Sequence, residues 1–268
     1  MSHHDTRTLG YLDRLSELDT PVHRTDSRAK LFTTLVFVVT VVSFGKYEIS
    51  ALIPFLLYPV VLAALGNLPL NYLAGRIAVV APFAVLVAVF NPILDREPML
   101  VLGGLRLSGG WVSFISIVLR FVLTVGAALI LLATTGMNRV CHALEKMGVP
   151  RVFTGQLLFL YRYLFTLAEE TVRMTRAISV RTAGRSNVPV RAYGSAAGHL
   201  LLRTLDRAQR VYAAMCCRGF DGHIRTMRTE RIRSTDILFV SGWSALFVLM
   251  RLHNVPRILG RLFMEAIQ

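Results

Sequence analysis

The chain has 268 residues and a net charge of +14, and its composition is 54% hydrophobic but only 17% charged. Its mean hydropathy of +0.53 is too high for an ordinary soluble domain. This composition excludes a typical soluble enzyme or binding module and indicates an all-α, polytopic membrane protein.

Apolar stretches predict about five transmembrane helices, in chain order at residues 31–44, 49–65, 72–90, 111–135 and 237–252. A helix that crosses a bilayer needs about 20 residues, so the first two are short, and the polar residues between them predict a helical hairpin. Asn91 and Pro92 are expected to close the third helix, because proline disfavours helix in the residue before it. The sequence that follows, residues 95–110, is expected to be a loop.

A long basic segment, residues 137–234, separates the fourth and fifth predicted spans. It holds 17 Lys and Arg against 6 Asp and Glu, a net +11. The positive-inside tendency places it in the cytoplasm, and four preceding spans then place the N-terminus there too. The expected domains are an N-terminal segment (1–30), a four-span domain (31–136), this cytoplasmic domain, and a last span with its tail (235–268). The charged first 30 residues predict no cleavable signal peptide.

Two stripes of the same chemistry lie 37 residues apart in the basic segment, each with an acid, an arginine, an alanine and an arginine at steps of four. They are Glu169, Arg173, Ala177 and Arg181, and Asp206, Arg210, Ala214 and Arg218. Steps of four stay near one face of a helix, and Gly184 and Gly219 follow as residues suited to helix ends. A solvated or lipid-facing helix explains one stripe, whereas the repeat favours two equivalent docking points for a partner protein.

The segments "HRTDSRAKLF", "LYRYLFTLAEETVRMTRAISVRTAGR" and "RAQRVYAAMCCRGFDG" resemble the transmembrane T component of energy-coupling factor transporters, most closely its cobalt or nickel branch, CbiQ. The resemblance covers about residues 11–250. It implies that two motifs dock into grooves on a dimer of ABC-type ATPases, here Val180-Arg181-Thr182 and Cys217-Arg218-Gly219. Valine, threonine and Cys217 depart from the usual Ala-Arg-Gly form, and Ser27 replaces a usual proline.

The resemblance also implies partners and a location. The partners are two CbiO-like ATPase subunits, a CbiM-like substrate-binding membrane subunit, with or without a CbiN-like subunit, and membrane lipid, but no nucleic acid. The chain itself is expected to be no enzyme and to bind no cofactor, with ATP-Mg on the ATPases. The basic segment supplies coupling helices in a multi-pass protein of the bacterial or archaeal cytoplasmic (inner) membrane that serves cobalt or nickel uptake.

Several other residues invite a functional interpretation. Adjacent Cys216 and Cys217 diverge by about 100° on a helix, so we expect buried packing residues rather than metal ligands, with Cys141 distant in sequence. His3 and His4 are expected to be incidental, so no metal site is predicted.

Arg120 lies within the fourth apolar stretch, where a charge is costly. Snorkelling to the membrane surface and contact with the substrate subunit both explain it. The "LSGG" at residues 107–110 resembles an ABC signature but is expected to be a turn, because the sequence has no GxxxxGK[ST] motif.

Two alternatives belong to other functional classes. A membrane-bound enzyme acting on an anionic lipid or phosphorylated substrate lacks a recognisable nucleophile and base, an HExxH motif or an acidic cluster near the spans. A basic tether for lipid or nucleic acid would bind diffusely, with every basic residue contributing similarly.

Overall fold

The computed structural model describes residues 15–45, 48–94, 98–102, 105–182, 189–222, 224 and 233–252. The chain divides into two compact units. One, which we call the membrane unit, comprises Arg14–Gly136 with Glu230–Gln268, and the other, the α8–α10 unit, comprises Met137–Thr229 with Met1–Asp13.

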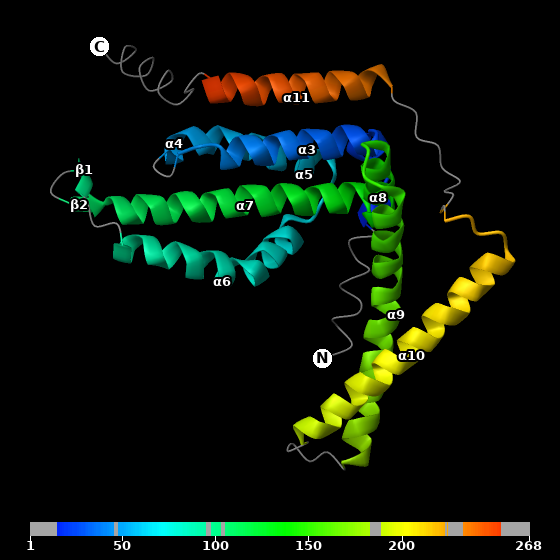
Figure 1. Cartoon of the computed structure of the whole chain (residues 1–268). Helices are drawn as coiled ribbons and strands as arrows, with labels where there is room; N and C mark the ends of the chain where they lie inside the picture. Colours follow the sequence, from blue (N-terminus) through cyan, green and yellow to red (C-terminus); the bar gives the residue numbers. More distant parts are fainter. Residues whose placement is uncertain are drawn as a thin grey trace. The chain divides into compact units, whose positions relative to one another are not determined.

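The membrane unit consists of helices that pack side by side. Its elements are α2 (Pro21–Arg24), α3 (Ser27–Val42), α4 (Ile49–Leu52), η1 (Ile53–Leu56), α5 (Leu57–Leu65), α6 (Leu70–Leu94), β1 (Pro98–Leu102), β2 (Leu105–Ser108), α7 (Gly109–Thr135) and α11 (Ser234–Leu252). Helix α7 packs against α6 and α3, and α3 packs against α11, as Figure 1 shows. The prediction of a helical membrane protein is confirmed.

Among the residues that the structure describes, three helices are long and apolar enough to cross a membrane, at Leu70–Pro92, Gly109–Thr135 and Ser234–Leu252. The first two predicted spans are helical but shorter. Helix α3 has 16 residues, and the stretch Ile49–Leu65 contains the 3-10 turn η1, where Pro54 has no N–H to donate.

Two local predictions were wrong. Helix α6 does not close at Asn91 but continues through Pro92 to Leu94, because proline near a helix end removes only one backbone hydrogen bond and few residues follow it. The expected loop between α6 and α7 contains the antiparallel strands β1 and β2, which pair from Pro98 with Ser108 to Leu102 with Leu105.

Aromatic rings form the centre of the membrane unit. Phe37 of α3 lies 4.7 Å from Tyr58 of α5 and 5.3 Å from Phe247 of α11, measured between ring centroids. The Tyr58 hydroxyl is hydrogen-bonded to the Thr34 hydroxyl at 2.9 Å, which satisfies its polar end. Large apolar side chains of α6, among them Val79, Phe83 and Leu86, are exposed on its outward face, which suits contact with lipid.

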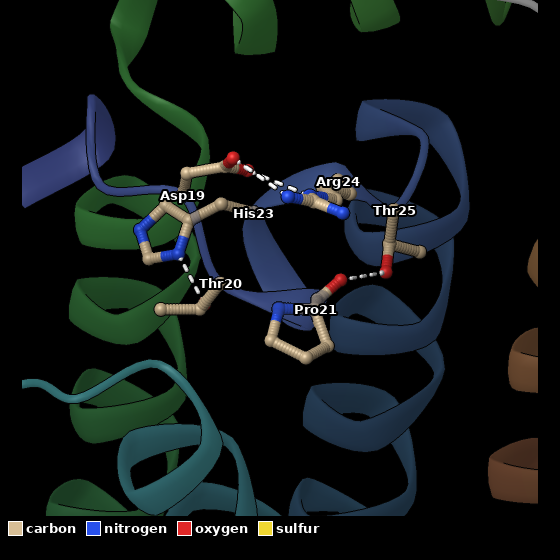
Figure 2. Close-up of polar contacts among 6 residues, drawn as sticks. All are labelled: Asp19, Thr20, Pro21, His23, Arg24 and Thr25. Atoms are coloured by element: carbon tan, nitrogen blue, oxygen red, sulfur yellow. Dashed lines mark hydrogen bonds and ion pairs between the residues drawn. The ribbon is translucent and has the colours of Figure 1, made fainter.

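Polar contacts join side chains of residues 19–25, just before α3 begins (Figure 2). Arg24 donates two hydrogen bonds of 2.7 Å to the carboxylate of Asp19, and this interaction lowers the pKa of that carboxyl. His23 is buried, with one ring nitrogen 2.6 Å from the Thr20 hydroxyl and the other 2.9 Å from the Leu15 carbonyl. These contacts fix the chain just before the first long helix.

The α8–α10 unit contains α8 (Met137–Lys146), α9 (Arg151–Arg181) and α10 (Val190–Cys217). Helix α8 packs against α9, and α9 contacts α10, which crosses it in Figure 1. Pro150 and Pro189 immediately precede the two long helices. Proline has no backbone N–H, and an N–H at the start of a helix has no acceptor within the helix. A proline is therefore tolerated at this position and marks the start of each helix.

Candidate functional site

Both stripes predicted from the sequence lie on long helices of the α8–α10 unit, the first on α9 and the second on α10. Every residue of the two stripes and of the two predicted docking motifs is exposed except Thr182, which is half-buried. The members are Glu169, Arg173, Ala177, Val180, Arg181, Thr182, Asp206, Arg210, Ala214, Cys217, Arg218 and Gly219. The exposure leaves this chemistry available to a partner.

The end of α10 has a complete Schellman motif around Arg218. The Phe220 N–H donates to the Met215 carbonyl at 3.0 Å, and the Gly219 N–H donates to the Cys216 carbonyl at 3.0 Å. Gly219 has a φ of 78°, the left-handed conformation that favours glycine. Arg218 is therefore the C-cap residue, held at a defined position on the last turn.

The end of α9 is closed by a threonine. The Thr182 N–H and its hydroxyl both donate to the Ile178 carbonyl at 3.0 Å, and Arg181 is the last helical residue. Gly184 lies outside the described residues, so its predicted role as a helix stop stays a prediction. The two ends each present an arginine at the helix terminus, as the last helical residue of α9 and as the C-cap of α10, although different residues terminate the helices.

Both arginines occupy the end of a helix where unpaired carbonyls carry partial negative charge, which favours a cation. Within the described part of the chain, no acceptor lies within hydrogen-bonding distance of the guanidinium of Arg181 or Arg218. Arg173 of the first stripe does have a partner, because its guanidinium lies 3.9 Å from the Glu169 carboxylate. In the first stripe the inner arginine is thus partly neutralised by its neighbour, whereas the terminal arginine is presented.

An apolar groove of about 440 Å³ lies between α9 and α10. Its lining includes Phe159 and Tyr163 from α9, and Val211 and Met215 from α10. Phe220, which follows the Schellman turn, lines the groove beside Met215, the contact that typically accompanies this motif. The sequence reasoning missed this groove, although apolar residues at steps of three and four on both helices signalled it.

One ion pair joins the two long helices. The guanidinium of Arg203 on α10 donates to the Glu170 carboxylate on α9 at 2.6 Å. Glu170 directly follows Glu169, the first residue of the first stripe, but its side chain is only 24% exposed. Glu170 therefore holds α9 against α10 and is less exposed than its stripe neighbour Glu169.

The expectation that Cys216 and Cys217 are buried was wrong. Cys216 and Cys217 are both exposed, because they lie on the outer face of the last turn of α10, whereas Cys141 is buried in α8. Burial raises the pKa of the Cys141 thiol. Among the residues the structure describes, no group of three or more His, Cys, Asp or Glu side chains could hold a metal ion. His3 and His4 lie outside those residues.

Arg120 has a partner within its own chain. Its guanidinium donates to the Gly45 carbonyl, in the turn between α3 and α4, at 2.5 Å. Arg251 of α11 reaches the same turn, where it donates to the Ser43 carbonyl at 3.2 Å and lies over the Phe44 ring. The two explanations that the sequence left open for Arg120 thus gain a third, an intramolecular tie.

The chain is similar to a family of transport proteins and to several of its members. The family model described as "Cobalt transport protein", CbiQ, matches residues 19–229. An uncharacterized protein of Methanocaldococcus jannaschii is 28% identical over 86% of this chain and 82% of its own. The energy-coupling factor transporter transmembrane protein EcfT of Bacillus subtilis is 26% identical over 75% of this chain and 81% of its own. The nickel permease LarQ of Lactiplantibacillus plantarum is 29% identical over 40% of both chains.

Proposed function

The chain belongs to the CbiQ family of cobalt transport proteins, and from that membership we propose that it is the coupling component of an ATP-driven metal importer. The family consists of membrane components of transporters, so the membrane-enzyme alternative is wrong. The observation that carries the proposal is the pair of exposed, arginine-ended helices, α9 and α10, that bear the same stripe.

In this proposal each arginine end docks into one subunit of an ATPase pair. An arginine has five donors in a planar fork, which suits a polar groove of carbonyl and carboxylate oxygens. Two equivalent arginines match two equivalent subunits. This sequence contains no GxxxxGK[ST] motif, so the proposal assigns ATP and its magnesium to the ATPase subunits.

The long helices supply the lever of the mechanism. At 1.5 Å per residue, the 31 residues of α9 extend about 46 Å and the 28 residues of α10 about 42 Å. When ATP binding and hydrolysis close and open the ATPase pair, helices of this length, tied by Arg203 and Glu170, carry the displacement as rigid bodies. A separate substrate-binding membrane subunit would then reorient and release its metal inward.

We further propose that the α8–α10 unit and the N-terminus lie in the cytoplasm, with the chain in the cytoplasmic (inner) membrane of a bacterium or archaeon. The net charge of +11 over residues 137–234 supports this orientation. We propose cobalt as the cargo, with nickel as the second candidate because the relative LarQ is a nickel permease.

Metal uptake by cells that contain the complete assembly tests the proposal. The chain is co-expressed with its ATPases and a substrate-binding membrane subunit, and the accumulation of radioactive cobalt or nickel is measured in cells. We expect ATP-dependent uptake of one of the two metals, abolished when this chain is omitted. Uptake that is equal with and without the chain would refute a coupling role.

A further inference from the structure

A buried polar cluster lies at one end of the membrane unit, formed by Asp26, Lys30 and Asp236, with the Thr134 backbone carbonyl as an acceptor. We call it the polar junction. Asp26 is 5% exposed, Lys30 2% and Asp236 3%, although charged side chains are seldom buried so completely. The junction brings together helices α3, α7 and α11, which are remote in sequence.

Asp236 links the first and last helices of the membrane unit. One carboxylate oxygen accepts the Arg233 N–H at 2.7 Å and so caps the N-terminus of its own helix, α11. The other accepts the N–H of Asp26, the N-cap residue of α3, at 3.0 Å. Asp26 in turn caps α3, because its side chain accepts the Arg28 N–H at 2.8 Å. The starts of both helices are therefore held by one carboxylate.

Lys30 links α3 to α7. Its ammonium group donates to the Thr134 carbonyl at 3.0 Å. Thr134 lies in the last turn of α7, where carbonyls have no partner within the helix. Each charge of the junction thus sits at a helix end of the opposite partial charge, negative groups at the starts of α3 and α11 and a positive group at the end of α7.

The junction coincides with both places where the chain passes between the two units. Helix α7 ends at Thr135, and the α8–α10 unit begins at Met137. The chain returns to the membrane unit at Glu230 and begins α11 at Ser234. Lys30 therefore holds the helix at the outgoing connection and Asp236 holds the helix at the returning one, and both act on α3.

The junction also has an alternative pairing available. One Asp26 carboxylate oxygen is buried without a hydrogen-bond donor, and Arg28 Nε is buried without an acceptor, among the residues described. Arg28 Nε lies 4.0 Å from the other Asp26 oxygen, too far for a good hydrogen bond. Asp26 and Arg28 both lie at the start of α3, so a rotation of their side chains would bring Nε to a carboxylate oxygen at the usual hydrogen-bond distance.

We propose that Asp26, Lys30 and Asp236 are positioning residues that convey the movement of both chain connections to α3, so that the membrane helices move as one body. This inference rests on the proposed coupling function. A buried charge network is costly compared with apolar packing, and in a moving part it specifies a defined set of arrangements. The junction accordingly affects coupling between ATP hydrolysis and transport more than assembly.

The ratio of metal transported to ATP hydrolysed, measured in liposomes that contain the complete assembly, tests the junction. Lys30→Met keeps the apolar stem but removes the donor, and Asp236→Asn removes one of two acceptors. Lys146→Met and Glu17→Gln are the matched controls, since Lys146 and Glu17 are exposed and lie outside the junction. We expect the junction variants to assemble and hydrolyse ATP, with the transport ratio lowered by about tenfold or more, the size expected for a lost charged hydrogen bond.

Two further observations keep the test decisive. Asp236→Ser retains an oxygen that can cap α11 but cannot serve two donors, so it separates helix capping from the link to α3. A normal transport ratio in all three variants, or loss of the assembly with both activities falling together in all three, would overturn the inference. Failure of the unmodified assembly to transport metal would instead refute the proposed function itself.

Discussion

Charge reversal at the two arginine ends is the most direct perturbation of the proposed docking. Arg181→Glu and Arg218→Glu each lower the net charge from +14 to +12. Both side chains are exposed and no described acceptor lies within hydrogen-bonding distance, so the main cost of each change is a negative charge at a helix C-terminus, which should lower the free energy of unfolding by no more than about 2 kcal/mol. An effect on binding would therefore not arise from misfolding.

The expected loss of affinity follows from the environment of a docked arginine. Removing one partner of a buried, hydrogen-bonded charge pair costs about 2 to 5 kcal/mol, so a value of about 3 kcal/mol weakens ATPase binding roughly a hundredfold. In the proposed docking each end binds its own ATPase subunit, so reversing both should weaken binding more than either alone.

Titration of a purified ATPase pair onto the chain in lipid nanodiscs measures these affinities. Arg191→Glu is the matched control, since Arg191 is also exposed on α10 and its reversal changes the net charge equally, but it lies in the first turn, far along the helix from Arg218. We expect Arg191→Glu to change the affinity by less than about threefold. Equal losses of affinity at all three positions, together with binding that weakens as salt is added, would refute two-point docking and favour a diffuse basic tether.

Three further predictions concern the same unit. Gly219→Ala should weaken ATPase binding, because φ of 78° costs an L-residue about 1 kcal/mol, whereas Gly219→Asn should be tolerated better, and circular dichroism should show both variants folded. Maleimide should label the exposed Cys216 and Cys217 much faster than Cys141 at pH 7 to 8, since burial raises the pKa of the latter thiol and limits access, and bound ATPase should slow labelling of Cys217; rapid labelling of all three would contradict the structure. Arg203→Ala should lower the free energy of unfolding by no more than about 1 kcal/mol, as expected for a partly exposed ion pair. It should nevertheless lower transport, because α9 is held less firmly against α10. Unchanged transport would argue against a rigid lever.

Much of the architecture could be predicted from the sequence, because it depends on local periodicity. Uninterrupted apolar runs specify membrane helices whatever their neighbours are, and the five predicted stretches are all helical. The two stripes could be found in the same way, since steps of four lie on one face of any helix. Gly219 predicted a helix end through its own backbone preference, and the Schellman motif confirmed it.

The wrong predictions near the ends of α6 and α10 concern features for which the sequence allows two outcomes of similar free energy. A proline close to the end of a helix either stops it or is included at the loss of one hydrogen bond, and at Pro92 the helix continues. The burial of Cys216 and Cys217 was misjudged because cysteine is usually buried, while the face of a helix that a partner covers is decided only by packing.

The partners of polar groups were decided by the tertiary structure alone. Asp26 and Asp236 are 210 residues apart in sequence, and Arg120 lies 75 residues from the carbonyl to which it donates. Sequence periodicity identifies which face of a helix is apolar, but it carries no information on which helix lies beside another. The sequence by itself therefore determined a helical membrane protein with two arginine-ended helices, whereas packing determined how its buried charges are paired, because hydrogen bonds depend on distances that only the folded chain defines.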